Sequence, residues 1–98
     1  MAKYIDQIGE YQIVETDKDF IVKNIKGEYD NHGHFKKLDT CYVIIRLMAR
    51  KTIPKKPYMI EAAKRITTDE KYKRDLVNKQ KKNKQRQYYY NPNKGVRR

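Results

Sequence analysis

Two histidines separated by one glycine, His32 and His34, are the residues whose spacing most directly suggests chemistry. On a strand, positions two apart point to the same face, so both imidazoles can meet one metal ion or one phosphate. A metal site needs further ligands, yet Asp30 is the only nearby carboxylate and no histidine follows His34. We therefore predict no metal and no cofactor, and expect the two rings to be polar strand side chains or contacts for a nucleic acid or another partner.

Other catalytic arrangements find little support in the sequence. The chain contains no serine, which excludes serine hydrolysis, and its four glycines are too scattered to form a phosphate-binding loop. The single cysteine, Cys41, lies in an apolar run and is expected to be a small buried hydrophobe rather than a nucleophile. We predict no catalytic residue. A minimal metal-dependent nuclease using His32 and His34 is the catalytic alternative.

The charge of the chain is concentrated at one end. The 98 residues hold 24 Lys and Arg against 12 Asp and Glu, a net charge of +12. Residues 71–98 contain eleven cations and one acid, whereas residues 1–35 contain four cations and seven acids. A segregated cationic segment is suited to holding polyanions, and binding through phosphates is strongly salt-dependent. We therefore predict nucleic acid as the first partner, with DNA favoured over RNA.

Pairs of cations bracket the predicted elements and add to the charge of the tail. A run of three tyrosines in the tail could stack on bases, fill a groove on another protein, or pack back onto the domain. The predicted nucleic-acid-binding residues are Lys36, Lys37, Arg50, Lys51, Lys55, Lys56, Lys79, Lys81, Lys82, Lys84, Arg86, Tyr88, Tyr89 and Tyr90. The second hypothesis is a host-directed interaction (inhibitor) protein, in which the acidic N-terminal sheet binds a bacterial enzyme and the basic tail only steers association. An acidic host protein is a further possible partner. A membrane is not expected as a partner, because the tail lacks an amphipathic apolar face.

The elements that must position these residues follow from hydrophobic spacing. Segments 10–16 and 20–25 are rich in strand formers and separated by a turn signal, and 32–37 can form a third short strand. Residues 38–51 show apolar side chains at helical spacing, although a buried strand competes with this interpretation. Pro57 suits the first turn of a second helix, and residues 67–70 have the form of a capping box that starts a third.

The predicted fold class is therefore α+β: an N-terminal three-stranded antiparallel meander followed by two to three helices and a basic tail. We predict a compact domain over residues 1–77 and a flexible or helical extension over residues 78–98, where apolar residues are few. The chain shows no signal peptide and no apolar stretch of the ~20 residues that a membrane span needs. We expect a cytoplasmic protein of a bacterial host cell.

Three short strands, a Gly-x-Phe-Lys-Lys ending (Gly33, Phe35, Lys36, Lys37) and a helix together resemble a small DNA-binding module. The arrangement, over roughly residues 10–50, is similar to AP2-type domains and to the arm-binding domains of phage integrases. The resemblance implies a sheet that lies in the major groove and a helix that braces it. The Lys-, Asn-, Ile- and Tyr-rich chain also resembles small orphan prophage proteins of Gram-positive bacteria, of the leukocidin-phage open-reading-frame-fifty type. Because the strands carry more acids than cations, we expect the acidic front to be the scaffold and the basic half to bind.

Overall fold

A computed structural model describes residues 2–89, with side chains up to residue 83. The chain begins with four strands, β1 (Lys3–Ile8), β2 (Tyr11–Glu15), β3 (Phe20–Asn24) and β4 (His32–Phe35). They form one antiparallel sheet in the order β1-β2-β3-β4, in which each strand pairs with the next along the chain. The predicted meander is confirmed, and the sheet contains one further strand, β1.

Three helices follow the sheet: α1 (Leu38–Ala49), α2 (Pro57–Ile66) and α3 (Glu70–Tyr89). The predicted α+β class is confirmed, and the segment after residue 38 is a helix rather than a buried strand. Its apolar side chains at i, i+3, i+4 and i+7 form one stripe, and all four of these residues, Cys41, Ile44, Ile45 and Met48, are buried. Pro57 occupies the first turn of α2, where its missing N–H leaves no hydrogen bond unmade.

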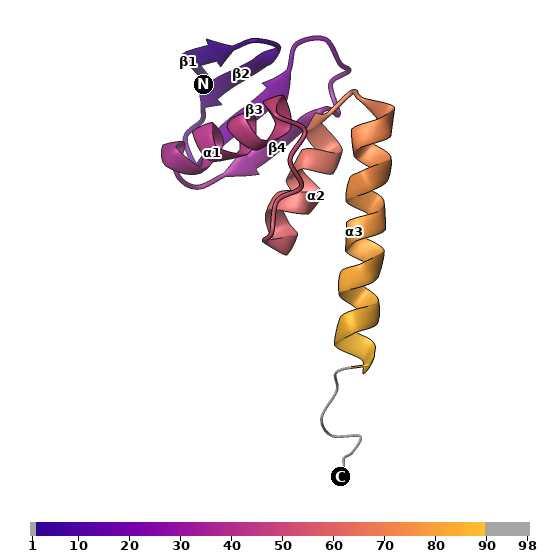
Figure 1. Cartoon of the computed structure of the whole chain (residues 1–98). Helices are drawn as coiled ribbons and strands as arrows, with labels where there is room; N and C mark the ends of the chain where they lie inside the picture. Colours follow the sequence, from indigo (N-terminus) through magenta and orange to yellow (C-terminus); the bar gives the residue numbers. More distant parts are fainter. Residues whose placement is uncertain (1, 90–98) are drawn as a thin grey trace.

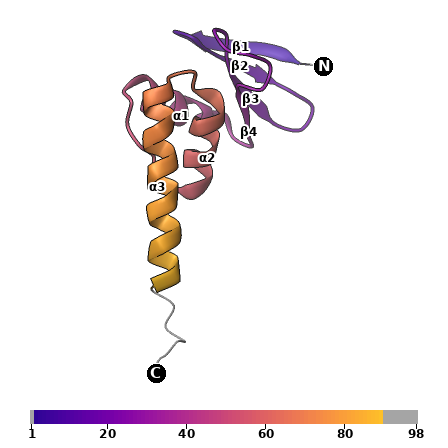
Figure 2. The same ribbon diagram turned by 90° about the vertical axis from the view of Figure 1, so that its right-hand side faces the viewer.

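The core lies between one face of the sheet and the helices. Ile13 and Val22 on the inward side of the sheet are fully buried, as are Ile60 and Ile66 on α2. Figures 1 and 2 show α1 and α2 on the same side of the sheet, with the opposite side uncovered by any helix. One face of the sheet is therefore part of the core, and the other faces outward.

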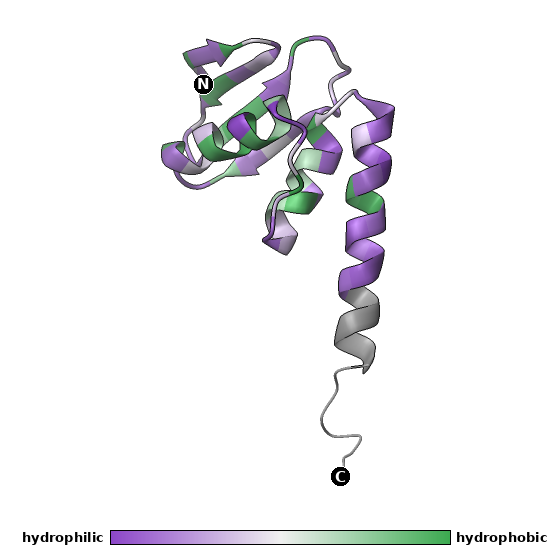
Figure 3. Cartoon of the chain, in the orientation of Figure 1, coloured by the Kyte–Doolittle hydropathy of each residue, from purple (hydrophilic) through white to green (hydrophobic). Residues whose placement is uncertain are grey.

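The helix α3 is attached to the body through its first half. Tyr72 and Leu76 are its buried apolar residues, and α3 makes its helix contacts with α2. Figure 1 shows α3 running back alongside α2 and continuing well beyond the N-terminal end of α2, and Figure 3 shows its coloured part as mostly hydrophilic. The helix passes without a break through residue 77, the predicted end of the compact unit.

The start of α3 differs in detail from the predicted capping box. The carboxylate of Asp69 accepts hydrogen bonds from the backbone N–H groups of Lys71 at 3.0 Å and Tyr72 at 3.3 Å. Thr67 instead accepts a bond from the N–H of Asp69 at 3.1 Å. Asp69 therefore caps the helix, because its side chain satisfies first-turn donors that have no partner within the helix.

Among residues 2–89, none of the helices combines the length and the apolar character that crossing a bilayer requires.

Candidate nucleic-acid interface

The segment between α1 and α2 is fixed by backbone hydrogen bonds and by one tyrosine. After α1 the chain turns through Lys51, whose φ of 57° is in the left-handed region, and the N–H of Thr52 bonds to the carbonyl of Leu47 at 2.9 Å. The hydroxyl of the buried Tyr72 donates to the carbonyl of Thr52 at 2.6 Å. Because Tyr72 belongs to α3, this bond holds the segment that carries Lys55 against α3.

Lys51 has a structural role at this junction. Its Nζ lies 3.0 Å from a carboxylate oxygen of Asp69 and 5.5 Å from the centre of the Tyr72 ring. The hydrogen bond from Lys51 lowers the pKa of Asp69 below its usual value, and the hydrogen bond that the backbone N–H of Tyr72 donates to this carboxylate adds to the effect. Lys51, predicted as a phosphate contact, is therefore engaged in joining the end of α1 to the start of α3.

A groove between α3 and the segment before α2 brings three of the predicted residues together. Its lining contains Lys55, Lys79 and Lys82, and we call it the lysine groove; the remaining lining residues are Ile53, Pro54, Asp75 and Asn78. None of the three lysines forms an ion pair with a carboxylate in the part of the chain whose side chains are described. Three ammonium groups against one carboxylate make this groove cationic, and Asn78 adds a hydrogen-bonding amide.

Part of the contact between α2 and α3 is polar, and Lys81 lies beside this part. Gln80 donates to Glu61 at 2.8 Å and accepts from Lys64 at 3.1 Å, and Lys64 lies 3.2 Å from Glu61. The hydrogen bond from Gln80 is the main reason that the pKa of Glu61 is lowered, with the bond from Lys64 second. Lys81 lines the hollow over this contact, so it faces a different side of α3 from the lysine groove.

The remaining predicted lysines and arginine of the folded part are exposed but separated. Lys36 and Lys37 precede α1, and Arg50 follows it. Since α1 has 12 residues, its ends lie about 18 Å apart at a rise of about 1.5 Å per residue. Lys56 is exposed immediately before α2. None of these four residues lines the lysine groove.

The two histidines lie on the outward face of β4, with their rings 5.1 Å apart between centroids. His32 Nδ1 is 2.7 Å from the carbonyl oxygen of Tyr29, and His34 Nδ1 is 3.0 Å from a carboxylate oxygen of Asp19. A carbonyl only accepts, so Nδ1 of His32 must carry the proton, and the carboxylate favours the same arrangement for His34. In both rings Nε2 remains the nitrogen that can meet a ligand.

A cationic hollow that sequence reasoning did not assign lies beside His32. Lys64 and Arg65 at the end of α2 and Lys73 on α3 line it together with His32; Asp30 and Asn31 complete the lining. Lys64 and Arg65 both also pair with the carboxylate of Glu61, at 3.2 Å and 3.9 Å. In the sequence, Lys64 and Arg65 form one of several pairs of adjacent cationic residues. Only the packing of α2 and α3 against the loop before β4 shows that they share a hollow with a histidine.

Several predicted residues cannot be placed. Lys84, Arg86, Tyr88 and Tyr89 belong to α3, but their side chains are outside the described part, and Tyr90 lies outside the described residues altogether. Within the described residues, no group of three or more His, Cys, Asp or Glu side chains converges in a way that could hold a metal ion.

Comparison of the chain with known protein families, with curated proteins and with solved structures finds no match. The proposed function therefore rests on the arrangement of side chains at the surface of the described residues.

Proposed function

We propose that the protein is a non-catalytic nucleic-acid-binding protein, of phage origin, that holds phosphates through its basic helical half. The observation that supports this proposal most is the lysine groove, in which Lys55, Lys79 and Lys82 come together from two segments of the chain. Ammonium groups that have no carboxylate partner repel one another, and a phosphate backbone relieves that repulsion while releasing its own counterions. DNA is the favoured polymer.

The position of the groove also fits a linear polyanion. Two of its lysines, Lys79 and Lys82, lie along α3, a 20-residue helix that Figure 1 shows extending beyond the rest of the fold. Lys79 and Lys82 are three positions apart, so they lie on neighbouring positions of one helix face. A nucleic-acid backbone that runs along this helix face could contact Lys79, Lys82 and Lys55 in turn.

The test replaces Lys79 and Lys82 together with glutamine and measures binding to a duplex oligonucleotide at low salt. The matched control replaces Lys3 and Lys18, two exposed lysines near the sheet, and changes the net charge equally. We expect weaker binding for the α3 pair and little change for the control pair. Equal losses for both pairs would show that total charge, rather than the lysine groove, determines binding.

A protein partner is the second candidate, because the outer side of the sheet exposes large apolar side chains. Tyr4 is 59% exposed, Ile25 48% and Tyr29 88%. Such residues are typical anchors of protein interfaces. A partner retained in a pull-down at high salt and after nuclease treatment would favour a host-directed interaction protein over a nucleic-acid-binding one.

A further inference from the structure

The outward face of the sheet is less acidic than the charge of its segment indicates. Side chains directly opposite one another on paired strands point to the same face, and the register places two rows of four on the outer side. These rows are Tyr4, Val14, Ile21 and His34, and Gln7, Gln12, Lys23 and His32. Neither row contains a carboxylate, although the carboxylate of Asp19, from the turn before β3, reaches His34 of the first row at 3.0 Å. The acids of residues 1–35 lie instead in turns, at strand ends or, for Asp6, against Tyr42 of α1.

Aromatic rings form a line at the edge of this face. The Tyr29 and His32 centroids are 5.4 Å apart with planes inclined at 59°, and His32 and His34 are 5.1 Å apart with planes inclined at 72°. Since the rings are tilted rather than stacked face to face, they do not cover one another. Tyr29 is 88% exposed, so its ring is accessible from solvent. The arrangement leaves aromatic faces available to a planar ligand.

The loop that carries Tyr29 is held in place by specific contacts. The Asn31 amide donates to the carbonyl of Arg65 at 3.0 Å, and its oxygen accepts from the N–H of Glu28 at 2.8 Å. A Cβ at Gly27 would lie 2.5 Å from that oxygen, so this close approach requires glycine. The carbonyl of Tyr29 binds His32. Such a loop presents Tyr29 without a large ordering cost on binding.

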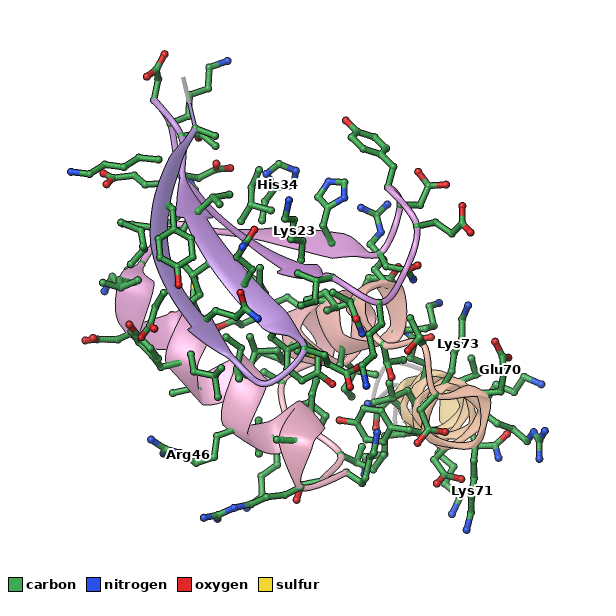
Figure 4. The ribbon with its side chains drawn as sticks, turned by 90° about the horizontal axis from the view of Figure 1, so that it is seen from above. Lys23, His34, Arg46, Glu70, Lys71 and Lys73 are labelled. Carbon is green, nitrogen blue, oxygen red and sulfur yellow. The ribbon has the colours of Figure 1, made fainter. Side chains whose placement is uncertain are left out.

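A hollow of about 510 Å³ lies between this loop and the strands, lined by both apolar and polar groups. Val14, Ile21 and Tyr29 supply apolar surface, Lys23 and His34 supply nitrogen atoms, and Glu28 supplies the one carboxylate of this lining. Figure 4 shows Lys23 and His34 on the side of the sheet away from α1, with Lys73 on α3 beyond the loop. His32 lines both this hollow and the cationic hollow of Lys64, Arg65 and Lys73.

We propose that this outer face binds single-stranded nucleic acid, with an unpaired base stacked on Tyr29 and the adjoining phosphates held by Lys23 and the cationic hollow beside His32. Aromatic side chains next to a cationic path are the combination that binds single strands with little sequence preference. A duplex cannot use Tyr29 in this way, because its bases are stacked on one another. The inference rests on the proposed function and adds a single-stranded ligand, bound at the outer face of the sheet, to the duplex contacts of the lysine groove.

The test compares Tyr29→Leu, which keeps apolar area without a ring, with Tyr29→Phe, which keeps the ring. Fluorescence anisotropy is measured with a short oligothymidine and with a duplex oligonucleotide. We expect Tyr29→Leu to bind the single strand about tenfold more weakly, because leucine offers no aromatic ring on which a base can stack. Tyr29→Phe should bind the single strand as the wild type does, and neither variant should change duplex binding. Because Tyr29 is 88% exposed, neither change should disturb folding.

Two results would overturn the inference: unchanged single-strand binding by Tyr29→Leu, or an equal loss for single strand and duplex. The Lys79→Gln/Lys82→Gln variant in the same series separates this failure from a failure of the proposed function. If that variant is weakened while Tyr29→Leu is not, only the stacking role is wrong. If the wild-type protein binds neither oligonucleotide at low salt, the nucleic-acid function itself is wrong.

Discussion

Replacement of Tyr72 by phenylalanine should have opposite effects on stability at neutral and at alkaline pH. The Tyr72 side chain is 3% exposed, and its hydroxyl donates to the carbonyl of Thr52 at 2.6 Å. Burial, with a contribution from the nearby Tyr11, raises the pKa of Tyr72 from 10.0 to about 12. Tyr72→Phe keeps the ring in the core and removes both the hydrogen bond and the ionisable group.

At neutral pH the variant should be less stable by about 1 kcal/mol, the typical net contribution of one hydrogen bond. Above pH 10 the folded protein retains a proton on Tyr72 that the unfolded chain loses, so wild-type stability falls as pH rises. For a pKa raised by about two units, Tyr72 alone accounts for a loss of roughly 1.4 kcal/mol by about pH 11. Tyr11, whose pKa burial also raises to about 12, contributes a similar loss to both proteins.

The two stability curves should therefore cross at about pH 11, above which the phenylalanine variant is the more stable protein. Urea unfolding followed by circular dichroism at neutral and alkaline pH measures both curves. Tyr58→Phe, at a side chain that is 55% exposed, serves as the control and should change neither. A constant gap between wild type and Tyr72→Phe at every pH would refute the assignment of a raised pKa to Tyr72.

Two further predictions concern the core. Leu76 is fully buried where α3 meets the body, so Leu76→Ala should lower the free energy of unfolding by about 2–5 kcal/mol. Val77→Ala, next to it at a partly exposed site, should cost less in the same urea titration, and equal costs would contradict the docking described for α3. Burial raises the pKa of the Cys41 thiol to about 11, and the side chain is fully buried. Maleimide labelling of Cys41 should therefore follow the unfolded fraction in urea, and rapid labelling of the native protein would contradict its burial.

Local pattern was enough to predict the three helices and three of the four strands. The helical stripe from Cys41 to Met48 and the position of Pro57 each depend on residues close in sequence. The first strand, β1, was missed because it has no clean alternation. Its register shifts between Tyr4 and Asp6, and Asp6 is turned toward the core by a 2.8 Å bond from Tyr42, which is distant in sequence.

The candidate surfaces were harder to predict, because each combines segments that only the fold brings together. The sequence identified Lys55, Lys79 and Lys82 individually, but their shared groove depends on the packing of α3. The sequence also suggested Lys51 as a phosphate contact together with these lysines, although its ammonium group forms an ion pair with the Asp69 carboxylate. The net charge of residues 1–35 gave no indication of where their acidic side chains lie. It could not show that these acids, apart from Asp6, lie in turns or at strand ends, outside the two rows of side chains on the outer face of the sheet.

The dependence of duplex binding on salt concentration tests the central claim most directly. Each phosphate neutralised contributes about 0.9 to the slope of log affinity against log salt. The proposed function predicts a steep negative slope for the wild type. Losing the two contacts of Lys79 and Lys82 should reduce its magnitude by about 1.8, while Lys3→Gln/Lys18→Gln should leave it unchanged. A wild-type slope near zero, or the same change in slope for both pairs, would contradict phosphate binding by the lysine groove.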